Sequence, residues 1–231
     1  MHNIRSELSF LDRNLTYAKE RGFVYPNAGR VTILQDIADV GGTVWDASIV
    51  LSHYLDSLGT TVLQGKSLVE LGAGTAVPSI VASRLGARAV ATDMKQVLLY
   101  TEMAIRGNCD QLHRNGRIRW QELIWGASGV GLEALKSTAY DYIVGADIVY
   151  NVEFFEDLIE TLLALCPMAL DHVEHPHPTT ILLCFEQRRR NLTPLWAAME
   201  MHFHVDMVTS PMLDACRHEA NVFLYQLRRK R

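Results

Sequence analysis

Two glycines one residue apart follow an acidic residue in the segment VELGAGTAVP, residues 69–78. A glycine turn of this kind lets the main chain approach a bound cofactor closely, because glycine accepts turn geometry and has no side chain in the way. The cofactor could be a nucleoside triphosphate, a dinucleotide or a nucleoside that carries a sulfonium group. Each needs different neighbours around the glycines.

The residues after the turn exclude a triphosphate site and argue against a dinucleotide site. A triphosphate site needs Lys and Ser or Thr directly after the turn, but no lysine occurs between Gly74 and Lys95. A dinucleotide site needs GxGxxG, and Val77 occupies the position of its last glycine.

Two acidic residues favour the third candidate, a nucleoside with a sulfonium group. Glu70 precedes Gly72 by two residues, where it would repel a pyrophosphate but suit a sulfonium and an α-amino group. Alternatively, Glu70 pairs with a nearby base or amide. Asp93, about twenty residues further on, suits a ribose hydroxyl in a dinucleotide or a sulfonium nucleoside. Its structural alternative is a helix N-cap.

Alternating strands and helices predict a mainly parallel α/β sheet covered on both faces. Apolar runs predict strands at 66–71, 87–93, 117–123, 140–150 and 179–187, then a hairpin-like pair at 202–208 and 221–227. One helix is expected with Trp45 in its first turn and with Thr43 and Asp46 as a capping box. Further helices are expected after Thr75, over 95–107, after Asn151 and after Pro194, with Thr75 and Asn151 as caps. Ligands of such sheets bind at the carboxyl ends of the strands. We therefore expect Gly72, Asp93, Asp147 and Trp125 around one crevice.

The composition of the chain indicates its domain size, its kinds of partner and its cellular compartment. The chain has 231 residues, a net charge of −4 and widely spaced cysteines, which suits one globular domain with reduced thiols. The charge gives no reason to bind nucleic acid or anionic lipid, and no apolar run is long enough for a membrane span. We expect a soluble monomer in the cytoplasm, with the nucleus as a second compartment.

The segment ELGAGT, followed by a strand ending in Asp93, resembles motif one and the ribose-binding acid of the class I, seven-strand methyltransferases, which use S-adenosyl-L-methionine. Residues 41–56, 123–126 and 145–150 resemble family sixteen of these enzymes, the protein-lysine methyltransferases that include the methyltransferase-like 21 group. CFEQR at 184–188 is similar to a segment of the member that methylates valosin-containing protein. One departure is Ala76, which stands where a third glycine is common.

The resemblance implies a Rossmann-like sheet of seven strands with a closing antiparallel strand. It also implies a methyltransferase domain at 41–231, after an N-terminal extension at 1–40 with a short strand. The cofactor-binding residues that it implies, taken together with Glu70, are Trp45, Gly72, Ala73, Gly74, Asp93, Trp125 and Ala146. Trp45 could equally be an ordinary core aromatic.

The acceptor implied is a lysine side chain of an intracellular protein, such as a chaperone-type ATPase or a translation factor. Enzymes of this class that methylate nucleic acid bases usually carry a tetrapeptide such as NPPY at the end of the fourth strand, where this chain has DIVY, 147–150. A lysine must lose its proton to attack, which costs on the order of 4 to 5 kcal/mol at pH 7. We assign Asp147 to hold the incoming amine and Tyr150 to orient it. Alternatively, Asp147 caps the turn and Tyr150 packs.

Two other features are interpreted as surface. The RRR at 188–190 and the C-terminal LRRKR are expected to be solvated, and the acids and histidines at 171–177 are expected to form a connector, so we predict no metal site. Other functions remain open: methylation of arginine or of a small amine, or a degenerate methyltransferase fold that serves as a protein-binding module.

Overall fold

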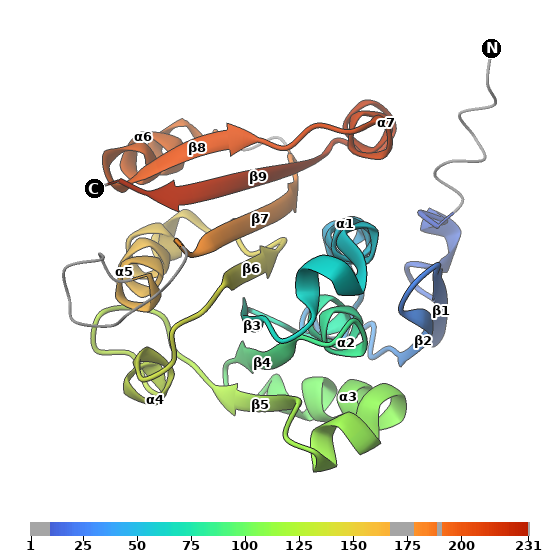
Figure 1. Cartoon of the computed structure of the whole chain (residues 1–231). Helices are drawn as coiled ribbons and strands as arrows, with labels where there is room; N and C mark the ends of the chain where they lie inside the picture. Colours follow the sequence, from blue (N-terminus) through green and yellow to red (C-terminus); the bar gives the residue numbers. More distant parts are fainter. Residues whose placement is uncertain (1–9, 167–177, 189–190, 231) are drawn as a thin grey trace.

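The computed structural model describes residues 10–166, 178–188 and 191–230. Its centre is a seven-stranded sheet in the order β5-β4-β3-β6-β7-β9-β8 (Figure 1). The strands are β3 (Ser67–Leu71), β4 (Arg88–Asp93), β5 (Ile118–Glu122), β6 (Tyr142–Ala146), β7 (Thr180–Glu186), β8 (Phe203–Met207) and β9 (Val222–Arg229). The pairs from β5 to β7 are parallel, and β9 is antiparallel to both β7 and β8. This confirms the expected sheet and its closing antiparallel strand.

Helices cover both faces of the sheet, as Figure 1 shows. One apolar cluster lies between the sheet and α1 (Asp46–Leu63), α2 (Val77–Arg84), α3 (Leu98–Arg114) and α7 (Pro211–Ala220). A second lies between the other face and α4 (Leu132–Lys136), α5 (Phe155–Leu165) and α6 (Thr193–His202). Because both faces are buried, the central strands carry continuous apolar runs.

Several local predictions were wrong. For the last two strands only the connection differs: β8 and β9 pair antiparallel as expected, but α7 lies between them in place of a short turn. Ser210 caps α7 by accepting a hydrogen bond from the Leu213 N–H, a signal that the sequence contained. Helix α1 starts without the predicted capping box. Its N-cap residue is Trp45, and the Thr43 hydroxyl donates to the Asp39 carbonyl instead.

Helix α2 also starts differently, with Ala76 rather than Thr75 as its N-cap residue. Asn151 does cap, but it caps the short 3-10 turn Val152–Phe154 that leads into α5.

The N-terminal region contains two strands rather than one. β1 (Glu20–Tyr25) and β2 (Gly29–Leu34) form a separate antiparallel pair that lies beside α1 and α2 (Figure 1). Its turn is held by the buried Asp56 carboxylate of α1, which accepts from the backbone N–H groups of Asn27 and Ala28 and from the Asn27 side chain.

The hairpin positions the loop before α1. The Gln35 side chain accepts a hydrogen bond from the Val44 N–H at 2.7 Å and donates to the Thr16 and Ala18 carbonyls. The buried Arg21 guanidinium donates to the Val44 carbonyl at 2.9 Å. Both contacts fix the residue directly before Trp45, so the N-terminal strands help to place the first residues of α1.

We predict that Asp56→Ala destabilises the fold by about 2 to 4 kcal/mol, because it leaves buried N–H donors without their charged acceptor. Chemical unfolding monitored by circular dichroism measures this change. Glu133→Ala is the control: its ion pair with Lys136 is exposed on α4, so the expected change is within about 0.5 kcal/mol. Equal stability of the two variants would show that Asp56 does not secure the hairpin.

Candidate active site

A cavity of about 550 Å³ opens at the carboxyl ends of β3, β4 and β6. Every residue predicted for the site lines it: Trp45, Glu70, Gly72, Ala73, Gly74, Asp93, Trp125, Ala146, Asp147 and Tyr150. Asp39, Val40, Met94, Ile148, Phe154 and Arg188 are among the further lining residues. The rule that ligands bind at strand ends therefore placed these residues together correctly; their individual roles remain predictions.

The turn after β3 is shaped by left-handed backbone. Gly72 and Gly74 have φ of 60° and 50°, a region that glycine enters without steric cost. A Cβ on Gly72 would lie 2.7 Å from Ile148 Cγ2, and one on Gly74 would lie 3.0 Å from the Gly41 carbonyl oxygen. The glycines thus keep the main chain open to the cavity.

Ala76 stands where a glycine is common, at a position with an unfavourable backbone conformation for alanine. It is also left-handed, with φ of 53°, a conformation that costs an alanine about 1 kcal/mol. It is fully buried and is not one of the residues that line the cavity, so the departure adds strain to the turn without filling the space for a ligand.

Asp93 secures the glycine turn. One carboxylate oxygen accepts from the Gly74 N–H at 2.8 Å and the other accepts from the Met94 N–H at 2.7 Å. It is not a helix N-cap, because α3 begins at Leu98 after Val97. Burial raises its pKa, and the two backbone hydrogen bonds partly oppose that shift. Each oxygen retains a lone pair for a ribose hydroxyl.

Glu70 is a buried acid at the base of the cavity. Its side chain accepts from the Ser79 N–H at 3.0 Å in the first turn of α2, which matches the expectation that it could pair with an amide. Desolvation raises its pKa to about 8, against the opposing effect of the Ser79 hydrogen bonds. A neighbouring cation would restore its negative charge.

Two tryptophans form aromatic walls. Trp45 is partly exposed, lines the cavity and donates its indole N–H to the Val40 carbonyl at 3.1 Å, so it is not an ordinary core residue. Trp125 lies opposite the glycines: its ring would be 3.5 Å from a Cβ on Gly72. Ala146, the last residue of β6, also lines the cavity and has only a small side chain.

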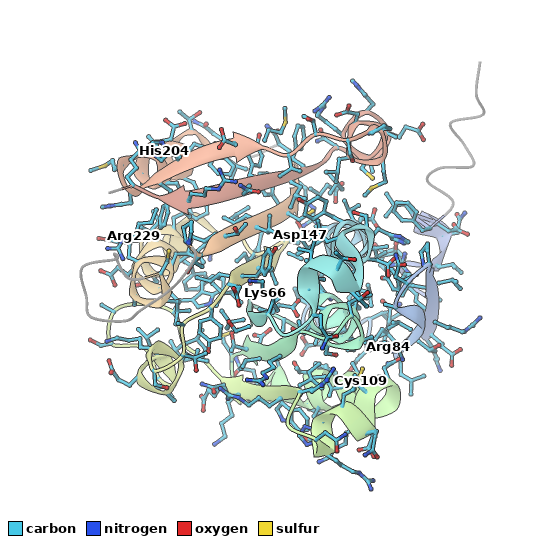
Figure 2. All side chains as sticks on the ribbon, viewed as in Figure 1. Lys66, Arg84, Cys109, Asp147, His204 and Arg229 are labelled. Atoms are coloured by element: carbon cyan, nitrogen blue, oxygen red, sulfur yellow. The ribbon has the colours of Figure 1, made fainter. Side chains whose placement is uncertain are left out.

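Asp147 is fixed at the end of β6 by contacts with β7. It is left-handed, with φ of 58°, its N–H donates to the Cys184 carbonyl at 2.7 Å, and its carboxylate accepts from the Glu186 N–H at 3.1 Å. Its side chain is only 8% exposed, and burial raises its pKa while Arg188 lowers it. Figure 2 shows Asp147 between the end of the sheet and α1.

Arg188 was missed as a site residue. Arg188 is exposed, as expected for the RRR segment, but its guanidinium also forms an ion pair with Asp147 at 2.9 Å and lies 5.0 Å from the centroid of the Trp45 ring. One feature of the sequence could have indicated Arg188: residues 184–188 are similar to a segment of a related methyltransferase. No spacing rule connects Arg188 with Asp147. Arg189 and Arg190 lie outside the described residues.

Tyr150 and Phe154 form the rim of the cavity. Tyr150 is 43% exposed and Phe154 is 44% exposed, so Tyr150 is not a packed core residue.

A family model described as lysine methyltransferase matches residues 27–202. The chain belongs to the lysine methyltransferase family. Its similar relatives include Protein N-lysine methyltransferase METTL21A of Xenopus tropicalis, 37% identical over 179 residues, which are 76% of this chain and 75% of that protein. The Danio rerio protein of the same name is 34% identical over 75% of this chain and 78% of its own length. The Mus musculus protein is 40% identical over 59% of this chain and 61% of its own length.

Solved structures share the fold at low sequence identity. The 16S rRNA N2 G1207 methyltransferase RsmC of T. thermophilus, in complex with AdoMet and guanosine, has a TM-score of 0.56 and 18% identity over 93% of this chain and 51% of that one. An S-adenosylmethionine-dependent methyltransferase from Agrobacterium tumefaciens has a TM-score of 0.56 and 14% identity over 92% and 71%. These likenesses support the Rossmann-like methyltransferase fold.

The family's cofactor, S-adenosyl-L-methionine, fits the site. The glycine turn provides a cradle that added Cβ atoms would fill, Asp93 has acceptor capacity for ribose hydroxyls, and Glu70 is an acid that lines the same cavity and could balance a positive charge. The chain is thus an S-adenosylmethionine-dependent lysine methyltransferase.

The described residues give two negative findings. They contain no group of three or more His, Cys, Asp or Glu side chains arranged to hold a metal ion; the predicted connector at 171–177 lies outside them. Within the same residues, no helix combines the length and the apolar character needed to cross a membrane.

We predict that cofactor affinity rises about tenfold between pH 6 and pH 8. With its pKa near 8, Glu70 is mostly protonated at pH 6, and a bound cation lowers that pKa, so binding releases a proton. Because the folded state holds this proton more tightly than the unfolded chain, Glu70 also contributes stability that declines as pH rises from about 4.5 toward 8. Calorimetric titration with the cofactor between pH 6 and pH 8 measures the predicted change in affinity. Glu70→Gln should flatten the pH dependence; an unchanged slope in that variant would assign the proton to another group.

We predict that Gly72→Ala weakens cofactor binding at least about tenfold and lowers stability by about 1 to 2 kcal/mol, through backbone strain and the contact with Ile148. Gly65→Ala is a matched control, since Gly65 has φ of 76° but open space around its Cβ direction. It should lose similar stability and keep cofactor affinity, as measured by thermal unfolding and calorimetry. Equal binding losses would point to a general effect of strain.

Proposed function

We propose that this lysine methyltransferase receives the side chain of a protein lysine at the mouth of the cavity, where Asp147 holds the amine and Tyr150 orients it. The observation that carries this proposal is the position of the Asp147 carboxylate, which is nearly buried and lines the same cavity as the glycine turn. A carboxylate there attracts an ammonium group to the place where methyl transfer would occur.

Binding of the cofactor is assigned to groups at the base and walls of the cavity. S-adenosyl-L-methionine supplies an electrophilic methyl group on a sulfonium. Gly72 and Gly74 let the main chain approach it, Asp93 accepts ribose hydroxyls, and Glu70 carries the balancing negative charge. Trp45, Trp125 and Ala146 enclose the remaining surface. This arrangement leaves the side of the cavity near Asp147 and Tyr150 for the acceptor.

The acceptor must reach the methyl group as a neutral amine. Desolvation by the Tyr150 and Phe154 rings disfavours the ammonium form, and a cation beside it does so further. Asp147 favours the ammonium while it enters, so its role is capture and alignment rather than removal of the proton. The exposed rim gives the proton a route to water.

We further propose that the substrate is a chaperone-type ATPase or a translation factor, and that the enzyme acts as a monomer in the cytoplasm and in the nucleus. The lysine methyltransferase relatives, named for action on proteins, support a protein substrate. The net charge of −4 gives the chain no general attraction for nucleic acid or anionic membrane.

The function can be tested by incubating the full chain and methyl-labelled S-adenosyl-L-methionine with extract from cells that lack the enzyme. Mass spectrometry then identifies the labelled protein and side chain. Label on a lysine Nζ supports the proposal. Label confined to arginine or to a small amine would contradict the acceptor, and label in nucleic acid would contradict the substrate class.

We predict that Asp147→Asn lowers kcat/KM at least tenfold, or about 1.4 kcal/mol, because it removes the charge that attracts the amine. Cofactor affinity should stay within a factor of a few, as measured by calorimetry. Tyr150→Phe removes only the hydroxyl and should cost less. If Asp147→Asn loses cofactor binding or folding together with activity, Asp147 is structural and the amine is held elsewhere.

A further inference from the structure

A cation already occupies Asp147 in this structure. Arg188 Nη2 lies 2.9 Å from Asp147 Oδ2, and its guanidinium carbon lies 5.0 Å from the centroid of the Trp45 ring. A carboxylate beside an aromatic face is also an arrangement that holds an alkylammonium ion. Arg188 therefore rests on Asp147, the carboxylate that a lysine amine would use.

Asp147 has little remaining capacity to bind a second cation. Its Oδ1 accepts from the Glu186 N–H at 3.1 Å, and Oδ2 faces Arg188. With Arg188 in place, the negative charge of Asp147 is already compensated, and the 8% exposure of Asp147 leaves little room for a second cation. An entering ammonium must take the place of the guanidinium.

Arg188 has a second acidic partner that can keep it nearby. Its Nε donates to Glu186 Oε2 at 3.2 Å. The Arg188 side chain is 40% exposed and that of Glu186 is 25% exposed, so a guanidinium that leaves Asp147 can remain paired with Glu186 and gain contact with water. The exchange thus moves a charge across the rim without burying an unpaired one.

We propose that Arg188 occupies the position of the acceptor's ammonium group on Asp147 and that the substrate lysine must displace it. This inference rests on the proposed role of Asp147. Displacement makes Arg188 a specificity-determining residue: a free amine gains too little from Asp147 to expel the guanidinium, whereas a lysine held by further contacts of a folded protein can do so. Arg188 then selects protein-bound lysines over small amines.

The test uses n-butylammonium chloride, which reproduces the lysine side chain, titrated into the full chain saturated with S-adenosylhomocysteine. The indole N–H signal of Trp45, assigned with Trp45→Phe, reports binding by NMR, and sodium chloride at equal ionic strength corrects for screening. Arg188→Gln should bind the probe about fivefold more tightly than the unchanged protein, the size expected for removal of a part-exposed competing ion pair. Adding Asp147→Asn to Arg188→Gln should abolish the gain.

Arg106→Gln is the matched control, because Arg106 also pairs with a carboxylate, Glu102, and lies 5.3 Å from the centroid of a tryptophan ring, Trp120, away from the cavity. It should leave probe affinity unchanged. Unchanged or weaker binding in Arg188→Gln would overturn the displacement role. If that variant also binds the probe equally with and without Asp147→Asn, or does not bind it, the proposed role of Asp147 fails as well.

Discussion

The position of β3 between β4 and β6 determines where this molecule can do chemistry. The chain leaves β3 toward α2 on one face of the sheet and leaves β6 toward α5 on the other. Because the two connections diverge, the carboxyl ends of these adjacent strands open a crevice between them. The glycine turn that follows β3 and Asp147 that follows β6 both line the cavity at that point, so one topological constraint brings together the residues that we propose bind the cofactor and the acceptor.

Three largely buried acids lie around the cavity, Glu70, Asp93 and Asp147. Desolvation raises the pKa of Glu70, Asp93 and Asp147, which means that each would be stabilised by positive charge or by hydrogen-bond donors. The protein supplies some partners itself: backbone N–H groups at Glu70 and Asp93, and Arg188 at Asp147. A reaction between a sulfonium and an amine brings positive charge to these same acids. Arg188 already supplies positive charge at Asp147, the residue that we propose binds the acceptor amine.

The sequence predicted the features that depend on neighbours along one strand or turn. Gly72 and Gly74, Glu70 and Asp93 follow from local spacing and from the rule that ligands bind at strand ends, and the parallel sheet follows from the alternating pattern. The missed features depend on tertiary contacts. The pairing of Arg188 with Asp147 spans 41 residues, and the start of α1 at Trp45 follows from contacts of Val44 with the N-terminal strands. Ser210 and Pro211 did signal α7, but the strand patterns on either side favoured a hairpin.

The central claim is that methyl donor and acceptor lysine meet between the ends of β3 and β6. A crystal structure of the full chain with S-adenosylhomocysteine tests it most directly. The account predicts the ribose hydroxyls on Asp93, the adenosyl group along the Gly72–Gly74 turn and the sulfur directed toward Asp147. A ligand with its sulfur directed away from Asp147, or bound outside this cavity, would contradict the account.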